Sequence, residues 1–196
     1  MMKQVLYGIL MVHLVTGCGS EKDNKASVKT TASENTTTSL KSPLRTVKAD
    51  GISVAIYDFK AFEPLLHQGN DTTYVINFWA TWCMPCVKEL PHFEKLLQTY
   101  KNEKVKVLLV SMDFPNKIKS QLIPFIKKKE LKSQIIMLDE PDANSWIDKI
   151  DESWSGAVPA TLMYNKKKRF FYPKPFTYNE LETEINKLLT IKNHKK

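Results

Sequence analysis

The sequence predicts an α/β domain in which helices cover both faces of a central mixed β-sheet. Residues 74–79 form a near-continuous apolar run, which is typical of a strand buried on both faces. Strand-like and helix-like segments alternate on either side of this run. The chain then ends with a strand pair and a helix, and this order favours a sheet that contains both parallel and antiparallel strands.

The first half of the domain follows from short apolar runs and from helical spacing. Residues 52–57 are a strand candidate, and residues 59–67 are expected to form a helix before the strand at 74–79. After this strand, apolar residues recur at spacings of three and four, which predicts a helix to about residue 100. Pro91 lies inside this helix and is expected to kink it. The expected apolar face consists of Val87, Leu90, Phe93, Leu97 and Tyr100.

The second half continues the alternation. Residues 105–111 are expected to form another buried strand, and residues 134–138 a further one. Between them, apolar residues at 118–126 mark one face of a helix, which Pro124 is expected to distort. Residues 143–150 are expected to form the next helix.

The chain closes with a hairpin and a capped helix. Residues 159–164 and 169–172 have the pattern of two strands joined by a basic turn. Thr177 and Glu180 form a capping-box pattern at the start of the last helix. The apolar face of that helix consists of Leu181, Ile185, Leu188 and Leu189.

The net charge of +8 does not come from one basic segment. Lys and Arg are scattered, with local runs at 127–129 and 166–169 that are expected at a helix end and in the hairpin turn. We interpret these runs as solvated faces, and an acidic partner or membrane head groups remain the alternative. No nucleic-acid partner is expected.

The first 48 residues are expected to lie outside the folded domain. Residues 1–17 resemble the signal peptide of bacterial lipoproteins, in which a short apolar core ends just before a cysteine, here Cys18. Cys18 would then carry a lipid anchor, and the alternative is an ordinary secretory signal with an unpaired thiol. Residues 19–48 are polar and contain no aromatic residue, which predicts a flexible tether before a domain at 49–196.

Two thiols lie where the buried strand gives way to a helix. Cys83 is expected at the helix N-terminus, where unpaired N–H groups and the helix dipole lower the pKa of a thiol. Cys86 follows about one turn later, close enough to form a disulfide with it. The pattern predicts a dithiol that attacks a disulfide elsewhere and is then resolved by its own second thiol. The alternative is half of a zinc site, which His67 and His92 would have to complete.

The segment Asn77-Phe-Trp-Ala-Thr-Trp-Cys-Met-Pro-Cys86 resembles the active-site segment of the thioredoxin family. More narrowly, it is similar to the membrane-tethered thiol–disulfide oxidoreductases of the TlpA/ResA kind. The resemblance extends over the whole domain from about residue 49 and implies a thioredoxin fold. It also implies that Cys83 and Cys86 are the catalytic, redox-active pair.

The resemblance assigns substrate-binding positions to three residues. Pro159 would be a cis proline that lies against the disulfide, and the backbone of Val158 would hydrogen-bond an extended substrate segment; an ordinary trans proline is the alternative. Trp82, together with Trp79, would shield the site and offer an apolar platform, although Trp79 could equally be a core residue.

Glu89 is the third catalytic candidate, one helical turn beyond Cys86. In proteins of the TlpA/ResA kind, a glutamate at this position is implicated in proton handling at the dithiol; the alternative is a solvated helix glutamate. Many cytoplasmic thioredoxins have a buried aspartate where this chain has Asn77. Because a neutral amide cannot act as a base, this difference strengthens the case for Glu89.

The predicted function is that of a lipid-anchored enzyme on the extracytoplasmic side of a bacterial membrane. It would reduce disulfides in envelope proteins, with apocytochrome c as one candidate target, and a membrane dithiol would supply the electrons. No cofactor or metal is expected. The alternatives are a disulfide oxidase or isomerase using the same site, a thiol peroxidase, and a module that delivers Cu(I) through Cys83, Cys86 and either Met84 or His92. Thr81 does not match the motif of thiol peroxidases.

Overall fold

A computed structural model describes residues 41–189 of the chain. The predicted signal peptide, the lipidation site at Cys18 and most of the predicted tether lie outside the described residues.

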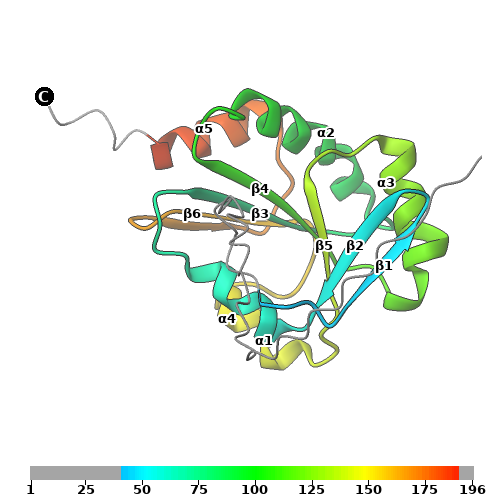
Figure 1. Ribbon diagram of the computed structural model, residues 1–196. Helices are drawn as coiled ribbons and strands as arrows, with labels where there is room; N and C mark the ends of the chain where they lie inside the picture. Colours follow the sequence, from blue (N-terminus) through cyan, green and yellow to red (C-terminus); the bar gives the residue numbers. More distant parts are fainter. Residues whose placement is uncertain (1–40, 190–196) are drawn as a thin grey trace, which may run out of the picture. The chain divides into compact units, whose positions relative to one another are not determined.

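The fold is built on one seven-stranded mixed sheet with the strand order β1-β2-β5-β4-β3-β6-β7 (Figure 1). The strands are β1 (Arg45–Ala49), β2 (Ile52–Tyr57), β3 (Thr73–Trp79), β4 (Val105–Ser111), β5 (Gln134–Leu138), β6 (Ala160–Tyr164) and β7 (Arg169–Tyr172). Strands β2, β5, β4 and β3 run parallel, whereas β1, β6 and β7 add antiparallel pairs. The predicted mixed sheet and its terminal hairpin are therefore confirmed.

Helices cover both faces of this sheet, as predicted (Figure 1). One face packs against α2 (Met84–Thr99), α3 (Ile123–Lys129) and α5 (Tyr178–Leu189), and the other against α1 (Phe59–Phe62) and α4 (Ile147–Ile150). The short helical turns are η1 (Glu63–His67), η2 (Pro115–Lys117), η3 (Ile118–Leu122) and η4 (Ala143–Ser145). Between residues 41 and 189, none of the helices has the length and apolar character needed to cross a membrane.

The domain begins earlier than residue 49. Strand β1 pairs with β2 through a tight turn at Asp50 and Gly51, which have φ angles of 51° and 76°. Of the residues in β1, only Val47 and Ala49 are even half-buried, because this strand lies at the edge of the sheet. An edge strand of this kind lacks the apolar run that marks a buried strand, and this is why the sequence predicts a tether for these residues.

Several predicted helices are interrupted. Residues 59–67 form one α-helical turn that continues as the 3-10 turn η1, which contains Pro64. The helix expected at 118–126 begins as the π-helical turn η3 and becomes α-helical only at Ile123, one residue before Pro124. Proline has no N–H to donate, and this explains why the regular ladder changes at both places.

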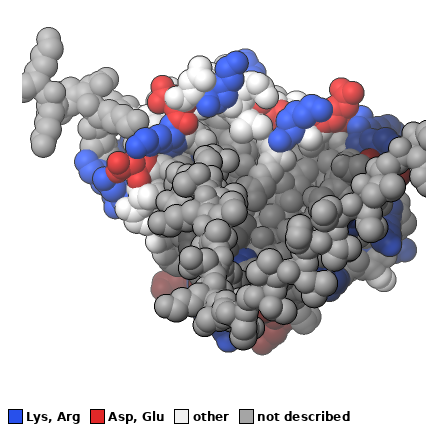
Figure 2. All heavy atoms as spheres, viewed as in Figure 1, with Lys and Arg blue, Asp and Glu red and all other residues white. Residues whose placement is uncertain are grey.

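Charges on the surface are mixed in sign. Lys and Arg lie beside Asp and Glu on the face shown in Figure 2. Exposed ion pairs such as Lys174–Glu180 and Lys187–Glu184 join the two signs at 2.7 and 2.6 Å. The basic run at 127–129 lies in the last turn of α3, as expected.

Candidate active site

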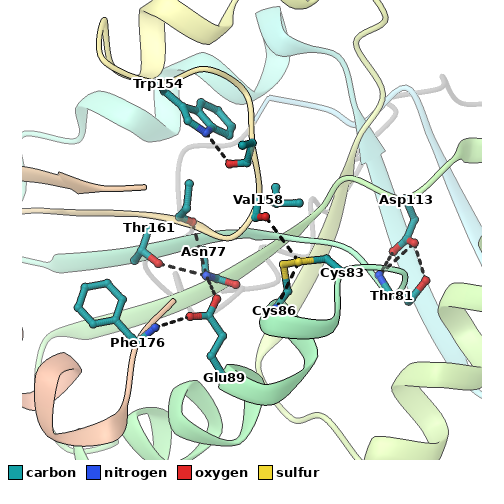
Figure 3. The surroundings of a disulfide bond; sticks show 12 residues. Asn77, Thr81, Cys83, Cys86, Glu89, Asp113, Trp154, Val158, Thr161 and Phe176 are labelled. Atoms are coloured by element: carbon teal, nitrogen blue, oxygen red, sulfur yellow. Dashed lines mark hydrogen bonds between the residues drawn. A yellow bond between two sulfur atoms is a disulfide. The ribbon is translucent and has the colours of Figure 1, made fainter. Parts of the chain in front are cut away.

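Cys83 and Cys86 form a disulfide at the junction of β3 and α2 (Figure 3). Cys83 is the N-cap of α2, and the backbone N–H of Cys86 donates to its sulfur at 3.3 Å. This N–H would stabilise a thiolate on Cys83 in the reduced protein, as the sequence predicts. The exposed fraction is 6% for Cys83 and 0% for Cys86, so Cys83 is the sulfur that a second molecule can reach.

The loop that carries Cys83 is fastened to the end of β4. The buried carboxylate of Asp113 accepts hydrogen bonds from the backbone N–H and the hydroxyl group of Thr81, the latter at 2.6 Å. Ser111 donates a further hydrogen bond to Asp113 at 2.9 Å. Sequence reasoning missed this contact, although β3 and β4 are parallel neighbours whose carboxyl ends meet at one edge of the sheet.

The loop before β6 lies against the same sulfur. The peptide bond between Val158 and Pro159 is cis, as predicted, and the Val158 carbonyl oxygen lies 3.6 Å from the Cys83 sulfur (Figure 3). Trp154 fixes this loop: its ring is buried, and its indole N–H donates to the Ala157 carbonyl at 2.8 Å. The amide and carbonyl groups beside the cis proline are thus placed close to the reactive sulfur.

Glu89 is buried, and the alternative of a solvated glutamate is wrong. Its exposed fraction is 1%. One carboxylate oxygen accepts from the Asn77 side chain at 2.9 Å, and the other accepts from the backbone N–H of Phe176 at 2.8 Å (Figure 3). Burial raises the pKa of Glu89 to about 7, against the opposing effect of these two hydrogen bonds. A carboxyl group with such a pKa can exchange protons near neutral pH.

The buried face of α2 differs slightly from the predicted one. Leu90 and Phe93 are buried as expected, but Val87, Leu97 and Tyr100 are only half-buried. Cys86, Glu89 and Leu96 complete the buried face instead. This small rotation of the buried face explains why the Glu89 carboxylate lies inside the protein.

The two tryptophans of the active-site segment occupy different environments. Trp79 is fully buried, and its ring packs against Phe125 with centroids 5.6 Å apart, so it belongs to the core. Trp82 is 52% exposed, directly before Cys83. Met84 and Phe114 are also exposed. Phe114 directly follows Asp113, whose hydrogen bonds to Thr81 anchor the loop before Cys83 (the Asp113 anchor).

The zinc alternative finds no ligand set in the part of the chain that the structure describes. No cluster there contains three or more His, Cys, Asp or Glu side chains that could hold a metal ion. Neither His67 nor His92 therefore completes a zinc site with the dithiol.

Comparisons with known proteins identify chains that are similar to this one. The model of the AhpC/TSA family matches residues 50–169. The thiol–disulfide oxidoreductase ResA of Geobacillus kaustophilus is 36% identical over 58 residues, which are 30% of this chain and 33% of that protein. The thioredoxin-like protein YneN of Bacillus subtilis is 30% identical over 137 residues, 70% of this chain and 73% of that one. The chain thus spans only about a third of the ResA relative but most of YneN.

A solved structure has the same fold. The thioredoxin-related protein from Neisseria meningitidis serogroup B aligns with a TM-score of 0.53 at 20% identity. The alignment covers 62% of this chain and 87% of that one. The predicted thioredoxin-like fold is therefore confirmed.

Proposed function

The chain belongs to the AhpC/TSA family, and we propose that it is a thiol–disulfide oxidoreductase that reduces disulfides in other proteins through Cys83 and Cys86. The position of the Cys83 sulfur carries this proposal. It lies at the N-terminus of α2, it is the more exposed of the two sulfurs, and it faces the peptide group before a cis proline. The names of relatives such as ResA support the same activity.

The reaction proceeds in two exchanges. The Cys83 thiolate of the reduced protein attacks one sulfur of a substrate disulfide, and the other substrate sulfur leaves as a thiolate that takes up a proton. Cys86 then loses its proton and attacks the Cys83 sulfur, which forms the Cys83–Cys86 disulfide and releases the first substrate sulfur. Two electrons pass to the substrate. An external dithiol, proposed to be in the membrane, then reduces the Cys83–Cys86 disulfide with two electrons of its own and is itself oxidised to a disulfide.

Each residue of the site has a proposed role in these two exchange reactions. Glu89 lies one helical turn beyond Cys86 and receives the proton that Cys86 loses, which its pKa of about 7 permits. The Val158 backbone and Pro159 dock an extended substrate segment beside Cys83, and Trp82 offers an exposed apolar surface to it.

A thiol peroxidase is less well supported on the same fold. The Thr81 hydroxyl, which would have to assist a peroxidatic cysteine, instead donates to Asp113 at 2.6 Å. Rapid consumption of hydrogen peroxide that depends on Cys83 would favour the peroxidase.

The proposed location is the bacterial cell envelope, with a lipid anchor on Cys18 and disulfide-bearing envelope proteins as substrates. Apocytochrome c is one candidate among them. Metabolic labelling with a fatty-acid analogue should label the wild-type protein and not Cys18→Ala. Equal labelling of both proteins would contradict the anchor.

Trapping the intermediate tests the activity. Cys86→Ser leaves Cys83 able to attack but removes the resolving thiol, so a mixed disulfide with a protein substrate such as insulin should accumulate. Cys83→Ser is the matched control and should form none. If both variants accumulate the adduct equally, or neither does, the assignment of Cys83 as the attacking sulfur fails.

The reduction potential of the Cys83–Cys86 couple decides the direction of electron flow between this protein and its substrates. A potential of roughly −270 mV, the value of thioredoxin, would support a reductase. A potential of roughly −120 mV, the value of a strong oxidant, would instead make the same site a disulfide donor.

A further inference from the structure

The buried carboxyl group of Glu89 can gain and lose a proton easily only if its surroundings suit both forms. An ionised carboxylate only accepts hydrogen bonds, whereas the protonated acid must also donate one. The backbone N–H of Phe176, 2.8 Å from one oxygen, is a donor in either case. The partner of the other oxygen must therefore be able to change from donor to acceptor.

That partner is Asn77, whose amide has a donating and an accepting end. Its Nδ2 lies 2.9 Å from Oε1 of Glu89, while its buried Oδ1 has no hydrogen-bond partner among the described residues. Half a turn of the amide group would exchange the two atoms and bring Oδ1 to Glu89. Either orientation leaves one end of the amide unpartnered, so neither is favoured strongly on that account.

Thr161 suits both orientations of the amide. It lies directly opposite Asn77 on the neighbouring antiparallel strand, with its Oγ1 at 3.1 Å from Nδ2. A hydroxyl group can accept from Nδ2 or, after the amide has turned, donate to Oδ1. The Ala160 carbonyl favours the observed orientation only weakly, since it lies 3.5 Å from Nδ2.

We propose that Asn77 and Thr161 are positioning residues for the proton on Glu89. The Asn77 amide presents Nδ2 to the ionised carboxylate and Oδ1 to the protonated acid. The Thr161 hydroxyl accepts from Nδ2 in the first case and donates to Oδ1 in the second. This inference rests on the proposed role of Glu89 in proton transfer. It gives the Asn77 amide, which lies between Glu89 and Thr161 in Figure 3, a role of its own, although the amide itself does not titrate.

The groups that are hydrogen-bonded to Glu89, directly or through Asn77, are neutral in the oxidised protein. They are the Asn77 amide from β3, the Thr161 hydroxyl from β6 and the Phe176 N–H that precedes α5, all linked through the contacts above. From α2 itself, Cys83 and Cys86 do not titrate while they form a disulfide. The raised pKa of Glu89 accordingly has burial as its main cause, and no charged group within residues 41–189 contributes to it.

Nuclear magnetic resonance of the oxidised, full-length chain tests the reversal directly. The titration midpoint comes from the Glu89 carboxyl signal, which is identified by its loss in Glu89→Gln. Above the midpoint, the Asn77 side-chain N–H protons should show a nuclear Overhauser effect to Thr161, and below it this effect should be lost. An effect of equal strength at both ends of the titration would overturn the proposal.

A variant gives the second readout. Asn77→Leu removes a donor from the carboxylate and an acceptor from the protonated acid. Because a hydrogen bond to an ionised group is stronger than one to a neutral group, the ionised form loses more, and the Glu89 midpoint should rise by about one pH unit. Thr73→Val, at another buried polar residue of β3, is the control. An unchanged or lower midpoint in Asn77→Leu would contradict the positioning role, even if stability falls.

Both measurements use the oxidised protein and no substrate. Failure of the positioning proposal would therefore leave the reductase proposal standing. Conversely, a protein that titrates as stated but reduces no disulfide would refute only the proposed function.

Discussion

Replacing Glu89 by Gln should remove one specific pH dependence of stability. The carboxyl group is 1% exposed, and its pKa rises from 4.5 to about 7 on folding because of burial. Between these two pH values the folded protein holds this proton more tightly than the unfolded chain does. Stability from this group is thus fully present below pH 4.5 and is lost as the pH rises through 7.

The size of the effect follows from the two pKa values. Each pKa unit corresponds to about 1.4 kcal/mol, so ionised Glu89 should lower the free energy of unfolding by about 3 kcal/mol at pH 8 relative to pH 4. Glu89→Gln is neutral throughout and should lack this component. The difference in unfolding free energy between wild type and variant should therefore fall by about 3 kcal/mol between pH 4 and pH 8.

Denaturant unfolding of both oxidised proteins at the two pH values measures this difference. Other titrating groups largely cancel when the two proteins are compared, and Glu152→Gln, at an exposed position, controls for the loss of one acidic side chain. The reasoning is refuted if the difference between wild type and Glu89→Gln is the same at pH 4 and pH 8.

Three further substitutions test the surroundings of the dithiol. Trp82→Ala should change the free energy of unfolding by less than about 0.5 kcal/mol, because the ring is half-exposed. The same substitution should raise KM for a protein disulfide but not for oxidised glutathione. Equal effects on both substrates would contradict a docking role. Asp113→Asn replaces a carboxylate oxygen by an NH2 group that faces the donors of Thr81 and Ser111. It should lower the free energy of unfolding by about 1–3 kcal/mol, measured by denaturant unfolding. An unchanged unfolding midpoint would show that the contacts of Asp113 do not fasten the loop. Gly156→Ala should cost about 1 kcal/mol or more, since φ is +84° and the new Cβ would lie 2.6 Å from Ile147, whereas Gly69→Ala meets nothing within 4 Å and should be tolerated.

The parts of the fold that could be predicted are those with strong local patterns. Strands β4 and β5 have the predicted limits because each is a short apolar run between polar residues. The capping box is confirmed too: the Thr177 backbone N–H donates to Glu180 at 2.8 Å, and the Glu180 N–H faces the Thr177 hydroxyl. By contrast, β1 gains its stability from pairing with β2, and such pairing leaves little trace in the sequence of an edge strand.

The candidate site also contains parts that could be predicted from the sequence and a part that could not. The dithiol, the cis proline and Glu89 belong to short segments that could be identified from the sequence. The Asp113 anchor could not be found from one segment, because it joins positions 32 residues apart. Only the geometry of two adjacent parallel strands brings them together.

The burial of Glu89 shows that the active-site motif alone does not determine the chemistry of the site. The alternation of β3 places Asn77 on the same face as Val75 and Trp79, which pack against the helices of that face. A polar side chain there needs a partner, and α2 begins directly after β3 and packs on this face. The motif therefore implies an amide–carboxylate contact once the helix is in place.

It does not imply the second hydrogen bond, from a backbone N–H 87 residues away. That contact holds the carboxylate inside the protein, where burial raises its pKa into the range in which a thiol can exchange protons with it. The motif thus supplies the sulfurs and the acid, and the segment before α5 closes the environment that sets the proton affinity of the acid.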